Sequence, residues 1–190
     1  EAFQLYNGMG ELNGSHYTNY PPINQLCFLI AALFASKSIY SAMIVLKIII
    51  ISADIGILYL GTKLLKRMHL PVKNIFWYVL NPFIIIEMTG NLHFEPVMIF
   101  FLVWSLLALH KKQWIWAAIL LACAISVKLI PLLLLPLFYQ WFVKNNQNWL
   151  KGFVKLNLFY SIVLSTTLLL FLPFYTSELI ENYSNSLGLW

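Results

Sequence analysis

Long apolar runs separated by short polar and basic clusters constrain this chain more than any other feature. The run 38–62 is long enough to cross a membrane as a helix, because a hydrocarbon core of roughly 30 Å needs about 20 helical residues. Of the 190 residues, 61% are hydrophobic and 10% are charged. An ordinary soluble domain carries more charge and less apolar surface. The sequence therefore predicts an integral, all-α membrane protein.

The basic clusters predict how the runs are oriented. After the run 38–62 come five residues that we expect on the cytoplasmic side, Lys63, Lys66, Arg67, His69 and Lys73. The apolar stretch 23–35 is too short to span and predicts an interfacial or re-entrant helix. Further crossings are expected at 74–90, 95–110, 114–130, 131–142 and 153–175. The expected fold is a transmembrane bundle of about six spanning helices over 38–175, with external loops at 1–22 and 176–190.

Other composition signals exclude several classes of function. The net charge of +5 lies in short clusters between apolar runs, so nucleic-acid binding is not expected. Cys27 and Cys123 lie in apolar runs and predict neither a disulfide nor a metal site. Because the first residue is Glu1 and no signal peptide precedes the first loop, we expect the chain to be a segment of a longer polytopic protein.

The stretch 81–95 is unusually polar for so apolar a chain. It places Glu87, Asn91, His93 and Glu95 within nine residues, between two apolar runs. Two interpretations are open: these residues cap and solvate a tight turn between membrane helices, or they form a reactive centre at a membrane face.

Glu95 and His93 are the first candidates for chemistry. Glu95 precedes Pro96, a pattern typical of a helix start, and a carboxylate there can simply cap the helix. Alternatively, the carboxylate and the imidazole address one substrate, for proton abstraction or hydrogen bonding to a sugar hydroxyl. Glu87, near the outer end of its helix, either bonds within the bundle or lines the site.

Three further features carry two interpretations each. Lys128, before Pro131, either snorkels to the interface or joins the amides of the helix starting at Pro96 in an anion site. Asp54 and Lys47 share a helix face, for which a polar network is favoured over direct catalysis. The loop 17–22 is either rigid or offers aromatic platforms, and sequons at Asn13 and Asn182 fall on the external side.

Four motifs together resemble a known superfamily. They are Tyr20-Pro21-Pro22, Asn81-Pro82 leading to Glu87, Gly90-Asn91-Leu92-His93-Phe94-Glu95, and Ser126-Val127-Lys128-Leu129-Ile130-Pro131. Their order resembles the polytopic C-type glycosyltransferases, in particular bacterial mannosyltransferase-like members that use polyprenyl-phosphate sugars. The resemblance implies an enzyme of the bacterial plasma membrane that passes a sugar from a lipid-phosphate donor to a glycan or lipid acceptor at the external or lumenal face.

The resemblance also implies roles for individual residues. Glu95 and His93 become catalytic candidates, with Glu95 as the base and His93, together with Lys128, at the donor phosphate. Asn91, Tyr20 and Glu87 become further substrate-binding candidates. The expected partners are membrane lipid, the lipid-linked donor and the acceptor, and a divalent metal is a possible cofactor although no ligand set for it is predicted.

The chain departs from the superfamily pattern in its opening loop. Relatives carry an acidic residue there that is thought to be the catalytic base, whereas this loop has Glu1 and Glu11 and no Asp. We expect the usual acidic motif upstream of residue 1. Some relatives have a Lys before the double proline, for which a contact with the donor phosphate is suggested. This chain has Tyr20 at that position, so the contact is not carried over to it.

Two other functions remain open on the sequence. A secondary transporter also has broken helices and buried ionisable residues, but it would show an inverted repeat, and none is detected. A non-catalytic membrane subunit would keep activity when Glu95 is changed. The absence of a Gly-rich phosphate loop disfavours a soluble nucleotide donor.

Overall fold

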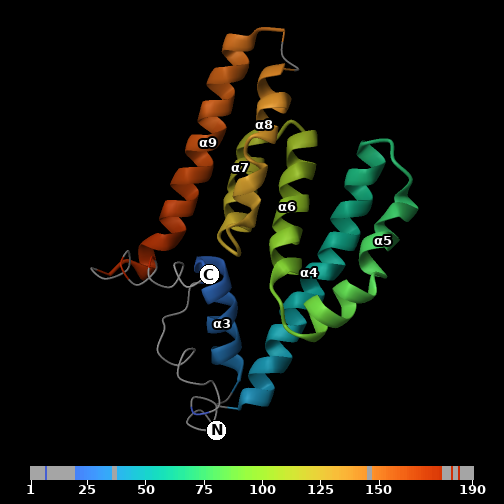
Figure 1. Cartoon of the computed structure of the whole chain (residues 1–190), viewed down its shortest axis with the longest axis vertical. Helices are drawn as coiled ribbons and strands as arrows, with labels where there is room; N and C mark the ends of the chain where they lie inside the picture. The colour runs from blue at the N-terminus through green and yellow to red at the C-terminus, as the bar shows by residue number, and fades with distance from the viewer. Residues whose placement is uncertain are drawn as a thin grey trace.

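The computed structural model describes residue 7, the ranges 20–35, 38–144 and 147–176, and residues 181 and 184. The described part is helical and has no strand. Figure 1 shows α6 (Glu95–His110), α7 (Trp114–Ile125) and α9 (Trp149–Phe171) standing beside one another, with α4 (Ile39–Arg67) leaning across from α3 (Pro22–Phe34). The all-α prediction is therefore confirmed.

Two helices are long and apolar enough to cross a membrane. The first is α4, whose 29 residues extend about 43 Å at 1.5 Å per residue. Its first turn is capped by Ser38, which accepts a hydrogen bond from the Ser41 amide, and its last turn carries Lys66 and Arg67, which complement the helix dipole. The second span is α9 with its short 3₁₀ extension, Trp149–Phe174.

The predicted helix 74–90 is wrong as a single crossing. A 3₁₀ helix, η1 (Val72–Ile75), leads into α5 (Phe76–Val79), which stops before Pro82, and the chain continues as the π-helix η2 (Ile84–Gly90). Proline cannot donate a backbone hydrogen bond and clashes with the preceding turn. The carbonyl of Tyr78, four residues before Pro82, accepts instead from the Asn81 amide at 3.1 Å, and the helix ends there.

The predicted crossings 114–130 and 131–142 are wrong for the same reason. α7 has only 12 residues, and the following chain forms η3 (Ile130–Leu134), a 3₁₀ helix, then α8 (Leu137–Tyr139) and the π-helix η4 (Gln140–Lys144). Pro131 and Pro136 break the segment twice. Neither piece reaches the length of a span.

Within the described residues the structure thus has two spanning helices, or three if η2 and α6 are one span bent by 107°. This is fewer than the six that we predicted. The length of the apolar runs alone predicted too many crossings, because three prolines and two π-helices divide the runs. Helix α3, with 13 residues, is short, in agreement with its length in the sequence.

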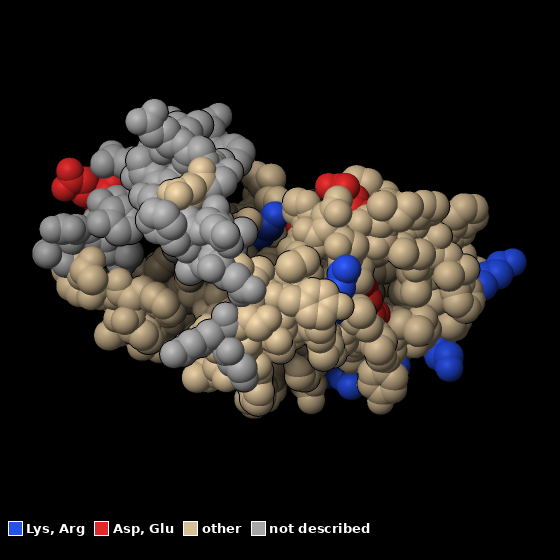
Figure 2. All heavy atoms as spheres, turned by 90° about the horizontal axis from the view of Figure 1, so that it is seen from below, with Lys and Arg blue, Asp and Glu red and all other residues tan. Residues whose placement is uncertain are grey.

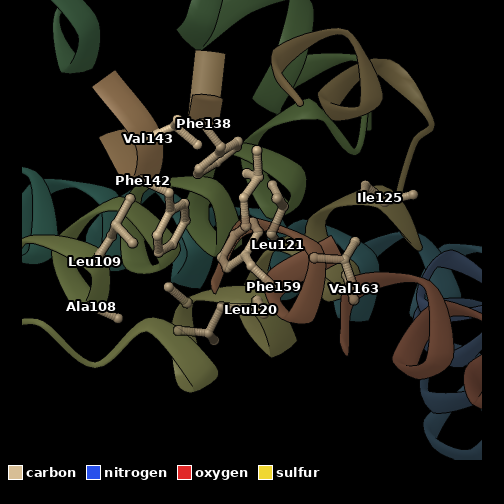
Figure 3. Packing of buried hydrophobic residues seen from close by; sticks show 14 residues of the cluster. Ala108, Leu109, Leu120, Leu121, Ile125, Phe138, Phe142, Val143, Phe159 and Val163 are labelled. Atoms are coloured by element: carbon tan, nitrogen blue, oxygen red, sulfur yellow. The ribbon is translucent and has the colours of Figure 1, made fainter. Parts of the chain in front are cut away.

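Two hydrophobic clusters hold the helices together. Figure 3 shows the larger one, where Phe138 and Phe142 pack on Phe159 of α9 with ring centroids 4.9 and 5.1 Å apart, beside Leu121 of α7. The second cluster joins α3, α4 and α6 through residues such as Cys27, Ile50 and Phe94. The broken segment 130–144 is therefore packed against α7 and α9.

The close approach of α9 to η4 yields a stability prediction. A Cβ added at Gly152 would lie 2.3 Å from the Phe142 carbonyl oxygen, a backbone atom that cannot rotate away. We expect Gly152→Ala to destabilise the protein by about 1–3 kcal/mol, because the helices must separate. Thermal unfolding in detergent measures this. The matched control is Gly61→Ala, where the nearest atom is the end of the Ile75 side chain; equal melting temperatures for the two variants would contradict the prediction.

Candidate functional site

The polar stretch 81–95 and the segment after α7 meet at one end of the bundle. The η2 helix, the turn that follows it and the start of α6 lie at the lower end of the bundle in Figure 1. Figure 2 looks at this end and shows blue and red atoms close together on its surface. The opposite end holds the basic turn 63–73 and the basic pair Lys111 and Lys112.

A π-helix and a left-handed residue shape this turn. The Met88 carbonyl accepts from the His93 amide, five residues on, at 2.8 Å. Leu92 then has φ of 61°, in the left-handed region that a bulky side chain rarely adopts. Such wide turns and backbone outliers occur often at functional sites. Here they reverse the chain within a few residues and direct His93 between two carboxylates.

Five of the predicted site residues form one chain of polar contacts. Asn91 Nδ2 donates to Glu87 Oε2 at 2.8 Å, and Glu87 Oε1 lies 3.3 Å from His93 Nε2. The other imidazole nitrogen, Nδ1, lies 3.8 Å from Glu95 Oε2. Lys128 Nζ donates to Glu95 Oε1 at 2.5 Å. The imidazole therefore bridges two carboxylates, and the second carboxylate carries an ammonium partner.

Glu95 is the most enclosed member of this chain. It is the first residue of α6, with Phe94 at the N-cap and Pro96 second, and its side chain is 21% exposed compared with 45% for His93. Its Oε2 atom is buried and makes no hydrogen bond to any described residue. One carboxylate oxygen is thus bonded to Lys128, and the other is left to accept a proton or a hydroxyl.

Tyr20 reaches the same region through aromatic packing. Its ring lies edge-on to Phe28 of α3 with centroids 5.6 Å apart, and Phe28 lies 5.4 Å from Phe94, the neighbour of Glu95. Tyr20 remains 41% exposed. Apart from residue 7, the loop 1–19 lies outside the described residues, including Glu1, Glu11 and the sequon residue Asn13, and so does Asn182.

The structure distinguishes between several of the alternatives. Lys128 is not a lone cation, since its ammonium is bonded to Glu95. Glu87 is about half-exposed and contacts Asn91 and His93, so it lies in the polar chain. Asp54 accepts a hydrogen bond from Thr89 at 2.8 Å, whereas Lys47 is exposed on α4 and is not part of this contact.

Sequence reasoning missed Thr89 and Tyr78. Thr89 bonds to Asp54, and the Tyr78 hydroxyl lies next to the same carboxylate. One feature of the sequence could have pointed to Thr89: it is a polar residue two positions after Glu87, in the otherwise apolar segment Ile-Ile-Ile-Glu-Met-Thr. An acidic residue in the middle of α4 needed a partner, and the turn supplied it.

Metal binding would need three ligands that converge. In the described part of the chain no three His, Cys, Asp or Glu side chains are placed to hold a metal ion. The two carboxylates nearest His93 face opposite nitrogens of its ring, so they point away from a common centre.

One end of the described helical bundle thus gathers carboxylates, an imidazole and an ammonium. Comparison with known proteins defines the class of protein. Residues 8–144, more than half of the chain, match the family described as alpha-(1->6)-mannopyranosyltransferase, N-terminal domain. The chain therefore belongs to this family of membrane mannosyltransferases. No curated protein and no solved structure gives a significant match.

The ion pair between the start of α6 and the segment after α7 yields a prediction about stability. Lys128→Met would leave the half-buried Glu95 carboxylate without its cation, which costs about 1–3 kcal/mol. Changing both partners, Lys128→Met with Glu95→Met, removes the unpaired charge. We expect the single variant to melt at a lower temperature in detergent and the double variant to recover most of the loss. A double variant as unstable as the single one would show that the ion pair does not hold these helices.

Proposed function

We propose that this chain forms the sugar-transfer site of an enzyme that moves mannose from a polyprenyl-phosphate donor to a glycan or lipid acceptor at the external face of a bacterial plasma membrane. Family membership supports mannosyl transfer. The observation that carries the finer proposal is the contact chain from Asn91 through Glu87, His93 and Glu95 to Lys128. In this contact chain a carboxylate lies beside an imidazole and an ammonium at one end of the bundle.

Glu95 is the base in this proposal. Its Oε2 atom takes the proton of the acceptor hydroxyl while the hydroxyl oxygen attacks the anomeric carbon of the donor. The bond between that carbon and the phosphate oxygen breaks, and the electron pair leaves with the polyprenyl phosphate. The sugar configuration inverts because attack and departure are on opposite sides.

Lys128 and His93 stabilise the departing phosphate. Without substrate the Lys128 ammonium is held by Glu95 Oε1, and an arriving phosphate offers it a second anionic partner. His93 lies between two carboxylates, and its ring N–H can donate a hydrogen bond to a phosphate oxygen. Asn91 and Glu87 can hydrogen-bond sugar hydroxyls, and the exposed Tyr20 ring offers a stacking surface.

The charge distribution supports the external placement. The turn 63–73 and the pair Lys111 and Lys112 lie at the end of the bundle away from Glu95, and Arg67 Nε donates to the His110 carbonyl there at 3.1 Å. Basic ends of membrane helices face the cytoplasm. The opposite end, which holds the contact chain, then faces outward, where the head group of a lipid donor can reach it from the bilayer.

The assay is transfer of radiolabelled mannose from polyprenyl-phosphate mannose in membranes that contain the full protein. We expect Glu95→Gln to lower transfer at least about 100-fold, the usual contribution of a general base. His93→Ala should lower transfer about ten-fold or more, because a hydrogen-bond donor at the phosphate is lost.

The matched control is His69→Ala, which removes an imidazole from the basic turn at the other end of α4. It should transfer at the rate of the unchanged protein. Full transfer by a well-expressed Glu95→Gln variant would contradict the proposal and would favour a non-catalytic role for this segment.

A further inference from the structure

We propose that Asp54, inside the membrane, is a positioning residue for the site: through Thr89 it fixes the π-helix η2 so that Glu87 reaches His93. The inference rests on the proposed function and adds residues that lie outside the contact chain described above. Its starting point is the hydrogen bond of 2.8 Å from Thr89 Oγ1 to Asp54 Oδ2, which joins η2 to the middle of α4 across 35 residues of sequence.

The free-energy cost of placing the Asp54 carboxylate in an apolar helix is the first argument. A carboxylate in the middle of a 29-residue apolar helix is expensive, and such residues are kept when they have a specific task. Within the described residues Asp54 forms no ion pair. Its carboxylate accepts from the Thr89 hydroxyl, the Tyr78 hydroxyl lies beside it, and its Oδ1 atom is buried without a hydrogen bond to any described residue. An ion pair with one of these residues therefore does not explain the carboxylate.

The geometry of η2 is the second argument. Residues two positions apart on a helix point to roughly opposite sides. When Thr89 faces α4 and bonds to Asp54, Glu87 is therefore turned away from α4, toward the site. There it accepts from Asn91 at 2.8 Å and lies 3.3 Å from His93. The anchor on one side sets the direction of the carboxylate on the other.

The low intrinsic stability of the π-helix η2 is the third argument. A π-helix is rare and has poor intrinsic stability, so its register needs outside support. Thr89 supplies this through the hydrogen bond to Asp54 at 2.8 Å. The same hydroxyl proton also lies near the Ile84 carbonyl oxygen, one π-turn earlier, with the oxygens 3.2 Å apart, so that carbonyl is the weaker second acceptor. Without the Thr89 hydroxyl, η2 can slip toward the ordinary helical register, which rotates Glu87 away from His93.

The decisive variants are Thr89→Val and Thr89→Ser. Valine keeps the shape of threonine and removes the hydroxyl, whereas serine keeps the hydroxyl. We expect Thr89→Val to lower kcat/KM for mannosyl transfer about ten-fold, and Thr89→Ser to stay within about two-fold of the unchanged protein. Thr167→Val is the matched control, because that hydroxyl bonds only to the Val163 carbonyl of its own helix.

A double-mutant cycle separates positioning from a general structural effect. If Thr89 acts through Glu87, Thr89→Val combined with Glu87→Gln falls no further than Glu87→Gln alone. If Thr89 only stabilises the fold, the two losses multiply. Multiplying losses, or full transfer by Thr89→Val, would overturn the inference.

A second substitution, at Asp54, should restore stability to the Thr89→Val variant without restoring its activity. Thr89→Val leaves the Asp54 carboxylate without its donor and lowers the melting temperature, while the pair Thr89→Val and Asp54→Leu removes both polar groups and recovers it. Transfer should stay about ten-fold low in the pair. If the pair recovers transfer together with stability, the positioning role is overturned and the proposed function is not. An active Glu95→Gln variant would overturn the proposed function itself.

Discussion

The ion pair between Glu95 and Lys128 is the interaction on which the arrangement of this end of the bundle depends. It joins the first residue of α6 to the segment after α7, two elements that otherwise meet through apolar contacts. In so apolar a chain neither charge could be half-buried alone without a large cost. The pair therefore holds the start of α6 against the segment that follows α7. It leaves one oxygen of Glu95, beside His93, without a hydrogen bond to any described residue.

The breaks in the helices matter as much as the helices. Pro82 ends α5, and the chain resumes as a π-helix that can present side chains to α4 and to the site from opposite sides. Pro131 lies at the start of the 3₁₀ helix η3 behind Lys128. Irregular backbone is tolerated in a membrane protein where neighbouring protein packs against it, as the first cluster does for the segment 130–144.

Part of this could be predicted from the sequence. Composition predicted the all-α membrane fold, and the density of polar residues at 87–95 drew attention to four residues that the structure brings into contact with one another and with Lys128. The number of crossings was not predictable from apolar length, because length does not show that Pro82 stops a helix whose Tyr78 carbonyl finds another donor. The contact between Thr89 and Asp54 was also missed, since it depends on the π-register of η2, which no pattern of hydrophobicity encodes.

The most direct test of this account is where a lipid-phosphate donor touches the protein. A polyprenyl-phosphate probe with a photoreactive group near its phosphate can be crosslinked in membranes that contain the full protein, and the modified peptides identified by mass spectrometry. We expect adducts in the segments 87–95 and 126–131, reduced when Lys128 is changed to Met. Adducts confined to the basic end, at 63–73 and 110–112, would contradict the claim that the Glu95–Lys128 pair marks the donor site.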